Sequence, residues 1–309
     1  MRNTYGSYLQ LDRLLSAQRT VTESDDEMLF IIIHQAQELW MKLLLHELAA
    51  SIKLLTAGAA SADALLLVCK HLSRCTNIQR SMIQSWEVLS TLTPDEFSTF
   101  RASVGKDNAS GFQSYQYRAL EFTLGLKYRA IEMTESGGRT RRTDLFKLHR
   151  HPDIVRFLEA CLKRPSIYQA CLLFMSGKAF GRLIDRRDFG PYHASEAVRR
   201  AWRTIYKDRR SHMELYQLAE TLVDVEDLFR QWRFRHVATV SRVIGSVSGT
   251  GGSAGLRYLL DKAVSSYAEP LFPELWEVRA EFFDASARPS PLEENHRDIE
   301  AQRSHRGSE

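Results

Sequence analysis

Apolar residues recur along this chain of 309 residues at the spacing of helices, and alternation of apolar and polar residues is nearly absent. Glycine and proline, which interrupt helices, number only 16 and 8. Because a strand buried on one face requires alternation at a period of two, the pattern predicts an all-α protein. A chain of this length can bury a large core in one domain. We therefore expect one helical domain over 1–284 and a polar, disordered tail over 285–309.

Signals at helix ends place the individual helices. Ser24-Asp25-Asp26-Glu27 is a capping-box sequence and predicts a helix from Asp25 to about Leu55. Thr93-Pro94-Asp95-Glu96 predicts the start of a short helix that stops near Gly105. Further helices are expected at 62–90, 115–126, 143–163, 166–182, 195–210, 211–244 and 274–283.

Two histidines lie on apolar faces of these predicted helices. His34 follows an apolar run in the first long helix, and His236 shares a stripe with Trp232, Val240 and Val243. A single histidine in such a setting is more often a hydrogen-bonded core residue than a ligand. Two of them together indicate a buried prosthetic group with imidazole on one or both sides.

Two further features are suited to a polar ligand. Phe97 and Arg101 are four residues apart and share one face of the short helix. Arginine in an apolar setting is costly unless it meets an anion, and its planar guanidinium suits a carboxylate; a surface salt bridge is the alternative. The loop Gly249-Thr250-Gly251-Gly252-Ser253 offers backbone amides and a hydroxyl, or is a plain flexible connection.

Composition argues against several other classes of protein. The formal net charge is +4 with both signs interspersed, so we expect no nucleic-acid partner. The four cysteines form no Cys-x-x-Cys pair and are expected to be reduced thiols. No apolar stretch reaches the ~20 residues that span a bilayer, and no signal peptide opens the chain. We therefore expect a soluble, cytoplasmic protein without a membrane partner.

Six separated motifs together resemble the tryptophan 2,3-dioxygenase family. They stand in the family's order: Tyr5-Gly6-Ser7-Tyr8-Leu9, Phe30-Ile31-Ile32-Ile33-His34-Gln35, Glu38-Leu39-Trp40, Ser110-Gly111-Phe112-Gln113-Ser114, Trp232-Arg233-Phe234-Arg235-His236 and Gly249-Thr250-Gly251-Gly252-Ser253. The resemblance implies an all-helical haem b protein, a homotetramer, that cleaves the indole C2–C3 bond of L-tryptophan with O₂. The product would be N-formyl-L-kynurenine, the first intermediate of tryptophan catabolism by the kynurenine pathway.

The resemblance also implies a role for each matching residue. His236 would be the axial ligand of the haem iron, and His34 the distal catalytic histidine that contacts the indole N–H. Phe30 would pack beside the indole, and Arg101 would pair with the substrate carboxylate. The other implied substrate-site residues are Phe97, Ser110 (which also lies near the haem), Gly249, Thr250, Tyr5, Tyr8 and Leu9. The last three belong to an N-terminal segment, 1–23, that would complete the active site of a neighbouring subunit.

The sequence departs from the family at three places. Phe97 stands where some bacterial relatives have tyrosine, the segment 105–109 is longer than usual, and 245–248 lacks the common basic residues. These changes leave the haem ligand in place and leave a substituted tryptophan open as the substrate. Two alternatives also stay open: a related haem oxygenase that inserts one oxygen atom into a tryptophan derivative, giving an oxindole or hydroxylated product, and a haem- or tryptophan-binding protein without turnover.

Overall fold

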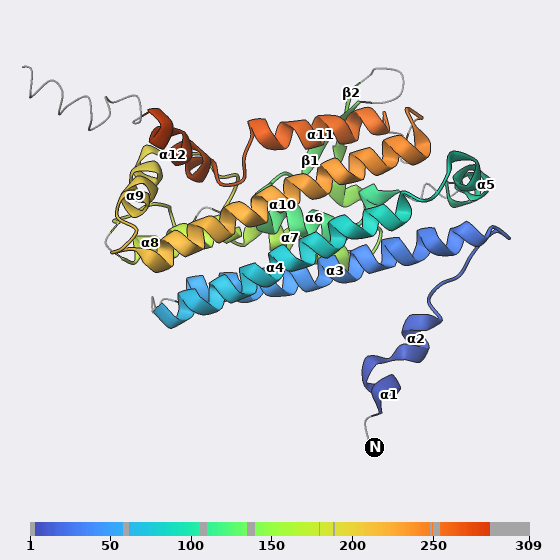
Figure 1. The fold of residues 1–309 in the computed structure, drawn as a ribbon, viewed down its shortest axis with the longest axis horizontal. Helices are drawn as coiled ribbons and strands as arrows, with labels where there is room; N and C mark the ends of the chain where they lie inside the picture. Colours follow the sequence, from blue (N-terminus) through green and yellow to red (C-terminus); the bar gives the residue numbers. More distant parts are fainter. Residues whose placement is uncertain are drawn as a thin grey trace, which may run out of the picture.

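Three long helices form the body of the protein in the computed structural model, which describes residues 4–57, 62–105, 110–134, 140–178, 180–187, 189–247, 249 and 254–284. They are α3 (Asp25–Thr56), α4 (Ala62–Leu89) and α10 (Met213–Ile244). Figure 1 shows them running along the longest axis of the molecule, with α4 packed against both α3 and α10. The prediction of a mostly helical protein is confirmed, whereas the tail at 285–309 lies outside the described residues.

Shorter helices surround this body. They are α5 (Pro94–Gly105), α6 (Tyr115–Leu124), α7 (Pro152–Lys163), α8 (Ile167–Ser176), α9 (Glu196–Lys207), α11 (Leu256–Ala268) and α12 (Pro273–Asp284), with 3₁₀ turns at Gly111–Gln113 and Leu145–Leu148. Helices α6 and α8 pack on α3, α7 packs on α6, and α11 packs on α10. Helix α5 lies at the end of the molecule where α10 finishes, and contacts both α3 and α10 (Figure 1).

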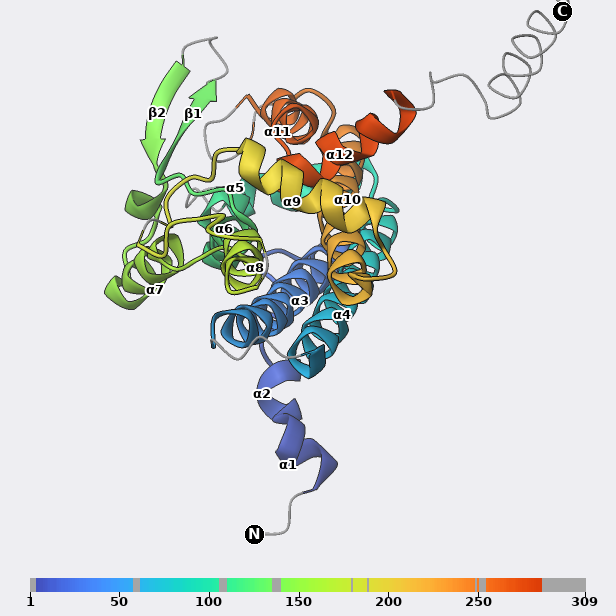
Figure 2. The same ribbon diagram turned by 90° about the vertical axis from the view of Figure 1, so that its left-hand side faces the viewer.

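A small antiparallel hairpin interrupts the helical architecture. Strands β1 (Ala130–Thr134) and β2 (Thr140–Asp144) pair with Ile131 opposite Thr143 (Figure 2). The single helix predicted over 143–163 is therefore wrong in its first part, since β2 and a 3₁₀ turn come before α7. The Asp144 carboxylate accepts a hydrogen bond from the Phe146 amide at 2.9 Å and turns the chain out of the strand. Strands of five residues are too short for alternation to stand out from background.

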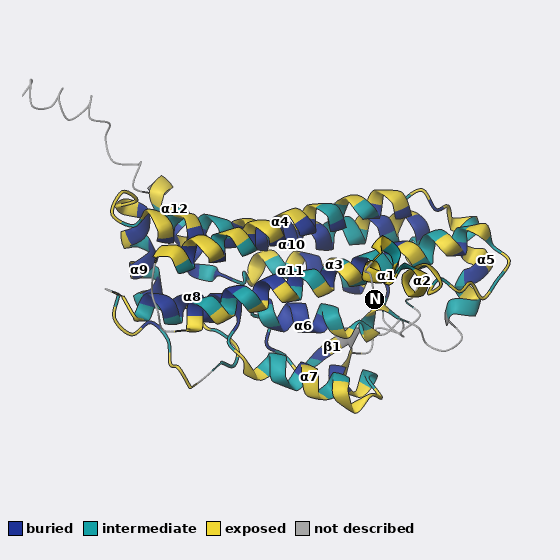
Figure 3. Ribbon diagram, turned by 90° about the horizontal axis from the view of Figure 1, so that it is seen from below, coloured by how far each residue is buried: buried dark blue, intermediate teal, exposed yellow. Residues whose placement is uncertain are grey.

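The N-terminus and the segment before Pro270 also hold helices that were not predicted. Helix α11 was not predicted because its short sequence, between the glycine loop and a proline, has the composition of a linker. Helices α1 (Tyr5–Leu9) and α2 (Leu11–Leu15) extend away from the body (Figure 1), and none of their residues is buried (Figure 3). The predicted helix over 166–182 is too long at its end, because α8 stops at Ser176.

The start of α3 is where the sequence predicted it, but the predicted capping geometry is wrong. Ser24 makes no side-chain hydrogen bond to the helix. The Glu27 carboxylate instead accepts hydrogen bonds from the Val21 and Thr22 amides, at 2.8 and 2.9 Å, and from the Thr22 hydroxyl. Glu27 therefore ties the incoming N-terminal segment to the first turn of α3.

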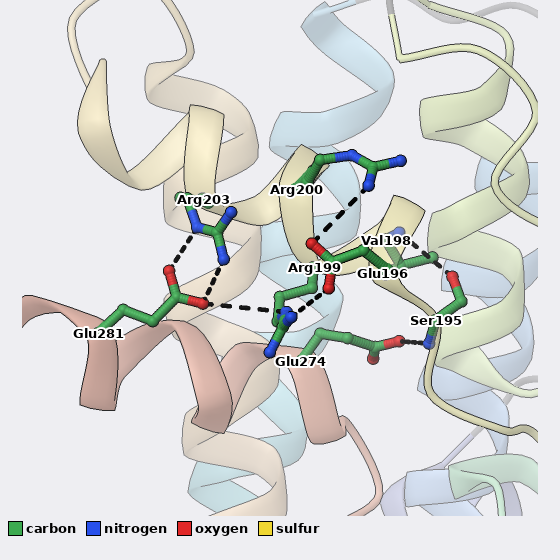
Figure 4. A network of polar contacts seen from close by, with 8 residues as sticks. All are labelled: Ser195, Glu196, Val198, Arg199, Arg200, Arg203, Glu274 and Glu281. Carbon is green, nitrogen blue, oxygen red and sulfur yellow. Dashed lines mark hydrogen bonds and ion pairs between the residues drawn. The ribbon is translucent and has the colours of Figure 1, made fainter.

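A polar network fastens α12 to α9 at the other end of the molecule. The Arg203 guanidinium and the Glu281 carboxylate form an ion pair with two hydrogen bonds (Figure 4). The buried Glu274 carboxylate accepts the Ser195 amide and the Tyr168 hydroxyl, both at 2.8 Å. A buried carboxylate is stable only when its acceptors are filled, so this network fixes the last described helix.

Two expectations from composition are also addressed by the structure. All four cysteines are free, as predicted. Helix α3 is the one described helix that is long and apolar enough, by composition, to cross a membrane. It packs against α4, α6 and α8 and supplies residues to the hydrophobic core.

Candidate active site

The two predicted histidines meet in one aromatic cluster near the end of α10. His34 comes from the first part of α3 and His236 from the last part of α10. The indole of Trp86, at the end of α4, stacks on the His236 ring with 4.7 Å between centroids and 14° between planes. The same indole lies edge-on to the His34 ring at 6.2 Å. Trp86 thus bridges the imidazoles, although nothing near it in the sequence marked it for this role.

A second set of aromatic rings covers the His34 side of the cluster. The Phe30 ring lies 4.1 Å from the His34 ring, which confirms that the two residues share a helix face. Helix α5 adds Phe97 and Phe100, at 5.6 and 5.7 Å from Phe30. Phe100 is fully buried and was not predicted as part of the site. The surroundings of His34 on this side are therefore aromatic rather than polar.

The hydrogen bonding of His34 fixes which of its nitrogens is an acceptor. His34 Nδ1 lies 2.8 Å from the Phe30 carbonyl oxygen. A carbonyl can only accept, so Nδ1 carries the proton. Burial lowers the pKa of His34, which keeps the ring neutral, although the Phe30 carbonyl and Glu38 offset part of this effect. A neutral ring with Nδ1 protonated leaves Nε2 as an acceptor for an N–H donor.

His236 is suited to bind a metal ion. Burial, reinforced by the neighbouring His34, lowers the pKa of His236 to about 4. The ring is therefore neutral at physiological pH, which is the form of imidazole that binds metals. It packs against the rings of both Trp86 and Trp232, and the centroid of the Trp232 ring is 5.6 Å away. The described residues contain no group of three or more His, Cys, Asp and Glu side chains placed to hold a metal ion.

The buried amide of Gln37 joins the three helices that carry this cluster. Gln37 Nε2 donates to the Met82 carbonyl at 2.8 Å and to the Ser85 hydroxyl at 2.7 Å, both on α4. Gln37 Oε1 accepts from Trp232 Nε1 on α10 at 3.1 Å. Gln37 is three residues after His34, and Trp232 is four before His236. Gln37 lies one helix turn from His34, and Trp232 lies one helix turn from His236, so the Gln37–Trp232 hydrogen bond helps to set the relative position of the two imidazoles.

Replacing Gln37 by leucine should loosen this arrangement. The change leaves Trp232 Nε1 buried without an acceptor, which costs roughly 1–3 kcal/mol of folding free energy. Urea unfolding monitored by circular dichroism measures that loss. Gln217→Leu is the matched control, because Gln217 is exposed on the same helix as Trp232. Equal stability of the two variants would show that the bridge is dispensable.

Arg101 lies on a helix that contributes rings to the cluster, whereas Ser110 lies at a 3₁₀ turn whose Phe112 packs against Tyr258 in a second hydrophobic cluster. Arg101 is half-buried, one turn after Phe97 on α5. Ser110 caps the 3₁₀ turn at Gly111–Gln113, with its hydroxyl accepting from the Phe112 amide at 3.4 Å. The structure thus places Arg101 on the helix that supplies Phe97 and Phe100, and gives Ser110 a local role in the turn.

The glycine loop is described only at its base. Gly249 belongs to the described residues, whereas Thr250 to Ser253 lie outside them. Gly255 closes the base with φ +59°, and a Cβ atom there would stand 2.3 Å from the Val247 carbonyl oxygen. Glycine is therefore required at 255, since any other residue would clash and adopt a strained backbone. The prediction for Thr250 stays a prediction.

The three site residues predicted in the N-terminal segment, Tyr5, Tyr8 and Leu9, are exposed and do not pack in the histidine cluster of their own chain. Tyr5 and Tyr8 are 77% and 73% exposed, and Leu9 is also exposed. The segment that follows them is tied to α3 next to His34, because Gln18 Nε2 donates to Gln35 Oε1 at 2.5 Å. Helices α1 and α2 therefore leave the body near the site and extend outward (Figure 2).

The fold and this cluster define a mostly helical protein with two neutral imidazoles packed in one aromatic cluster. The sequence profile of the family described as tryptophan 2,3-dioxygenase matches residues 1–179 and 187–282. The chain belongs to this family of oxygen-incorporating oxidoreductases.

Three relatives illustrate how far the similarity extends. A tryptophan 2,3-dioxygenase of Bacillus cereus is 45% identical over 280 residues, covering 89% of this chain and 91% of the relative. A tryptophan 2,3-dioxygenase of Polaromonas sp. is 43% identical, and the match covers 90% of this chain and 87% of the relative. A tryptophan 2,3-dioxygenase of Ruegeria pomeroyi is 42% identical, and the match covers 90% of this chain and 92% of the relative. The similarity therefore spans both the long helices and the aromatic cluster.

Proposed function

We propose that the protein is a haem-dependent dioxygenase that cleaves the indole C2–C3 bond of L-tryptophan with O₂ to give N-formyl-L-kynurenine. The observation that carries this proposal is the pair of neutral imidazoles, His34 and His236, in one aromatic cluster. Both stand in the motifs through which the chain resembles its family. The names of its relatives point to the same reaction.

The residues around His236 fit a haem group. His236 would hold the haem iron, because iron binding needs a neutral imidazole and His236 has that form. Trp86 and Trp232 offer the flat apolar surfaces on which a macrocycle packs. Trp86 Nε1 is a buried donor without an acceptor among the described residues. Bound haem would supply the binding and activation of O₂, and the chain supplies position and exclusion of water.

The amino-acid end of the substrate would be held from α5 and the glycine loop. Arg101 presents a guanidinium on the helix that also carries Phe97 and Phe100, so charge and aromatic surface lie together. We assign Arg101 to the substrate carboxylate, and Gly249 with Thr250 to the ammonium and carboxylate. Phe30 and Phe97 would pack against the indole. Holding both ends of tryptophan would fix the orientation of its C2–C3 bond, and such positioning is a large part of the rate.

His34 orients the indole in this proposal and takes no obligatory part in proton transfer. Its Nε2 accepts the indole N–H, because Nδ1 is committed to the Phe30 carbonyl. We expect His34→Ala to retain haem and a reduced turnover, at a loss of about tenfold for one hydrogen bond. Haem absorbance per chain and the steady-state rate measure the two effects. His46→Ala is the matched control on the same helix, where His46 is exposed. A variant without any turnover would contradict a purely orienting role.

Assembly would complete the site. Helices α1 and α2 expose Tyr5, Tyr8, Leu9 and Leu15 and bury no residue in their own chain. Apolar side chains in such numbers indicate a surface that another molecule covers. We propose that these residues enter the active site of a neighbouring subunit in a homotetramer.

Haem content and product mass test the proposal directly. The purified protein should hold one haem b per chain, and its reduced form should convert L-tryptophan and O₂ to N-formyl-L-kynurenine. A protein that binds haem yet leaves L-tryptophan unchanged would contradict it, and ring-substituted tryptophans would then identify a different substrate.

A further inference from the structure

A second pocket lies away from the histidine cluster, between α10 and α11. The connection after α6 and the connection between α11 and α12 complete its walls. The pocket holds about 440 Å³ of space that protein atoms do not fill, part of it open to solvent. Its apolar side chains include Phe229, Tyr128 and Leu271, and its charged ones include Arg230, Arg233 and Lys262. None of these residues belongs to the site described above.

The charges buried around this pocket do not balance. Three buried guanidinium groups, those of Arg118, Arg230 and Arg233, lie among two buried carboxylates, those of Glu121 and Glu226. Glu121 pairs with both Arg118 and Arg233, and Glu226 pairs with Arg230. The buried set therefore carries one positive charge in excess. Unbalanced buried charge is costly unless an anion or water compensates it.

The two buried carboxylates have no remaining capacity to neutralise a further cation. Glu226 accepts the amides of Leu271 and Phe272, at 2.8 and 3.1 Å, and Trp276 Nε1 at 2.8 Å, in addition to Arg230. Arg230 Nε is buried and finds no acceptor among the described residues. This donor is closed to solvent in the structure, so a ligand's acceptor would reach it only after a shift of the Arg230 side chain.

Lys262 adds a further cation at the rim of the pocket. Its ammonium lies over the rings of Tyr128 and Tyr258, at 5.8 and 5.9 Å from their centroids. No ion pair joins it to a carboxylate of the described chain. Glu269, the other acidic residue of the pocket, is exposed. Ser265 and Ser266 from α11 also line the pocket, and their hydroxyls donate to the Lys262 and Ala263 carbonyls.

We propose that this pocket binds a small organic carboxylate. The carboxylate group would lie between Lys262 and the two arginines of α10, and the apolar body against Phe229 and Tyr128. Guanidinium and ammonium groups are the usual partners of carboxylates, and a buried aromatic floor favours an organic anion over a hydrated inorganic one.

Titration of the haem-loaded protein with benzoate tests the proposal, with benzamide as the neutral molecule of the same shape. Calorimetry should show benzoate binding with a Kd below about 1 mM and benzamide binding at least about tenfold more weakly. Equal binding of the two compounds, or no binding of benzoate, would overturn the proposal. Inorganic phosphate that binds as tightly as benzoate would overturn the preference for an organic carboxylate.

Benzoate binding by single-residue variants tests where the anion lies. Lys262→Met should weaken benzoate binding at least about tenfold. Ser266→Leu, which fills the pocket without removing charge, should abolish it. Lys163→Met is the control, because Lys163 is exposed on α7 outside the pocket. Arg101→Ala should leave this benzoate binding intact, so the outcome is independent of the proposed tryptophan site. Benzoate binding lost in Arg101→Ala and kept in Lys262→Met would place the anion in the active site and contradict the inference.

Discussion

Replacing His236 by alanine should yield a folded protein without stably bound haem and without dioxygenase activity. The reason is that in the proposed site His236 is the neutral imidazole that would hold the iron, with a pKa lowered to about 4 by burial. We do not expect His34 to replace it, because its Nδ1 is committed to the Phe30 carbonyl and we assign its Nε2 to the indole N–H of the substrate. Absorbance of the haem band per chain, with circular dichroism as the folding check, measures the loss.

The control for this variant is another histidine replaced in the same way. His193 is exposed in the connection before α9, so His193→Ala should keep haem and activity. Adding free imidazole to His236→Ala should restore haem absorbance in part, because the deleted side chain leaves room for it. Haem content and turnover equal to the unmodified protein would show that another residue holds the iron.

Arg101→Ala should weaken tryptophan binding and leave haem binding unchanged. Removing a cation that pairs with a buried carboxylate costs roughly 2–5 kcal/mol, which is about 25-fold or more in affinity. The Kd of L-tryptophan for the reduced haem protein without O₂, followed by the shift of the haem band, measures this effect apart from the reaction.

Two comparisons make the Arg101 result specific. Arg80 is exposed on α4, and Arg80→Ala should leave the Kd unchanged. Tryptamine, which lacks the carboxylate, should bind the unmodified protein and Arg101→Ala with similar affinity. If Arg101→Ala prefers L-tryptophan over tryptamine by the same factor as the unmodified protein, Arg101 does not belong to the substrate site.

The sequence predicted most of the helices because their signals are local. Helical periodicity and capping residues act within a few positions, so α3, α4, α5 and α10 begin and end close to the predicted residues. The hairpin of β1 and β2 was missed because its stability depends on cross-strand pairs such as Ile131 with Thr143. Helix α11 was missed because a glycine loop and a proline flank a short segment.

The site was predicted in part for a similar reason. His34, His236 and Phe30 stand out as unusual residues on apolar faces, and the structure brings them together. Trp86 and Gln37 act through contacts with helices that are distant in sequence, which no local pattern reveals. The polar network of Arg233 has the same origin. Its burial against Glu121 depends on α6, which is distant in the sequence.

The most direct test of the central claim is a count of the oxygen atoms that reach the product. The reduced haem protein is mixed with L-tryptophan without oxygen, given a pulse of ¹⁸O₂, and its product is weighed by mass spectrometry. The proposed dioxygenase gives N-formyl-L-kynurenine with both oxygen atoms labelled. A ring-closed product with one labelled atom would contradict it and identify the protein as a monooxygenase of the same family.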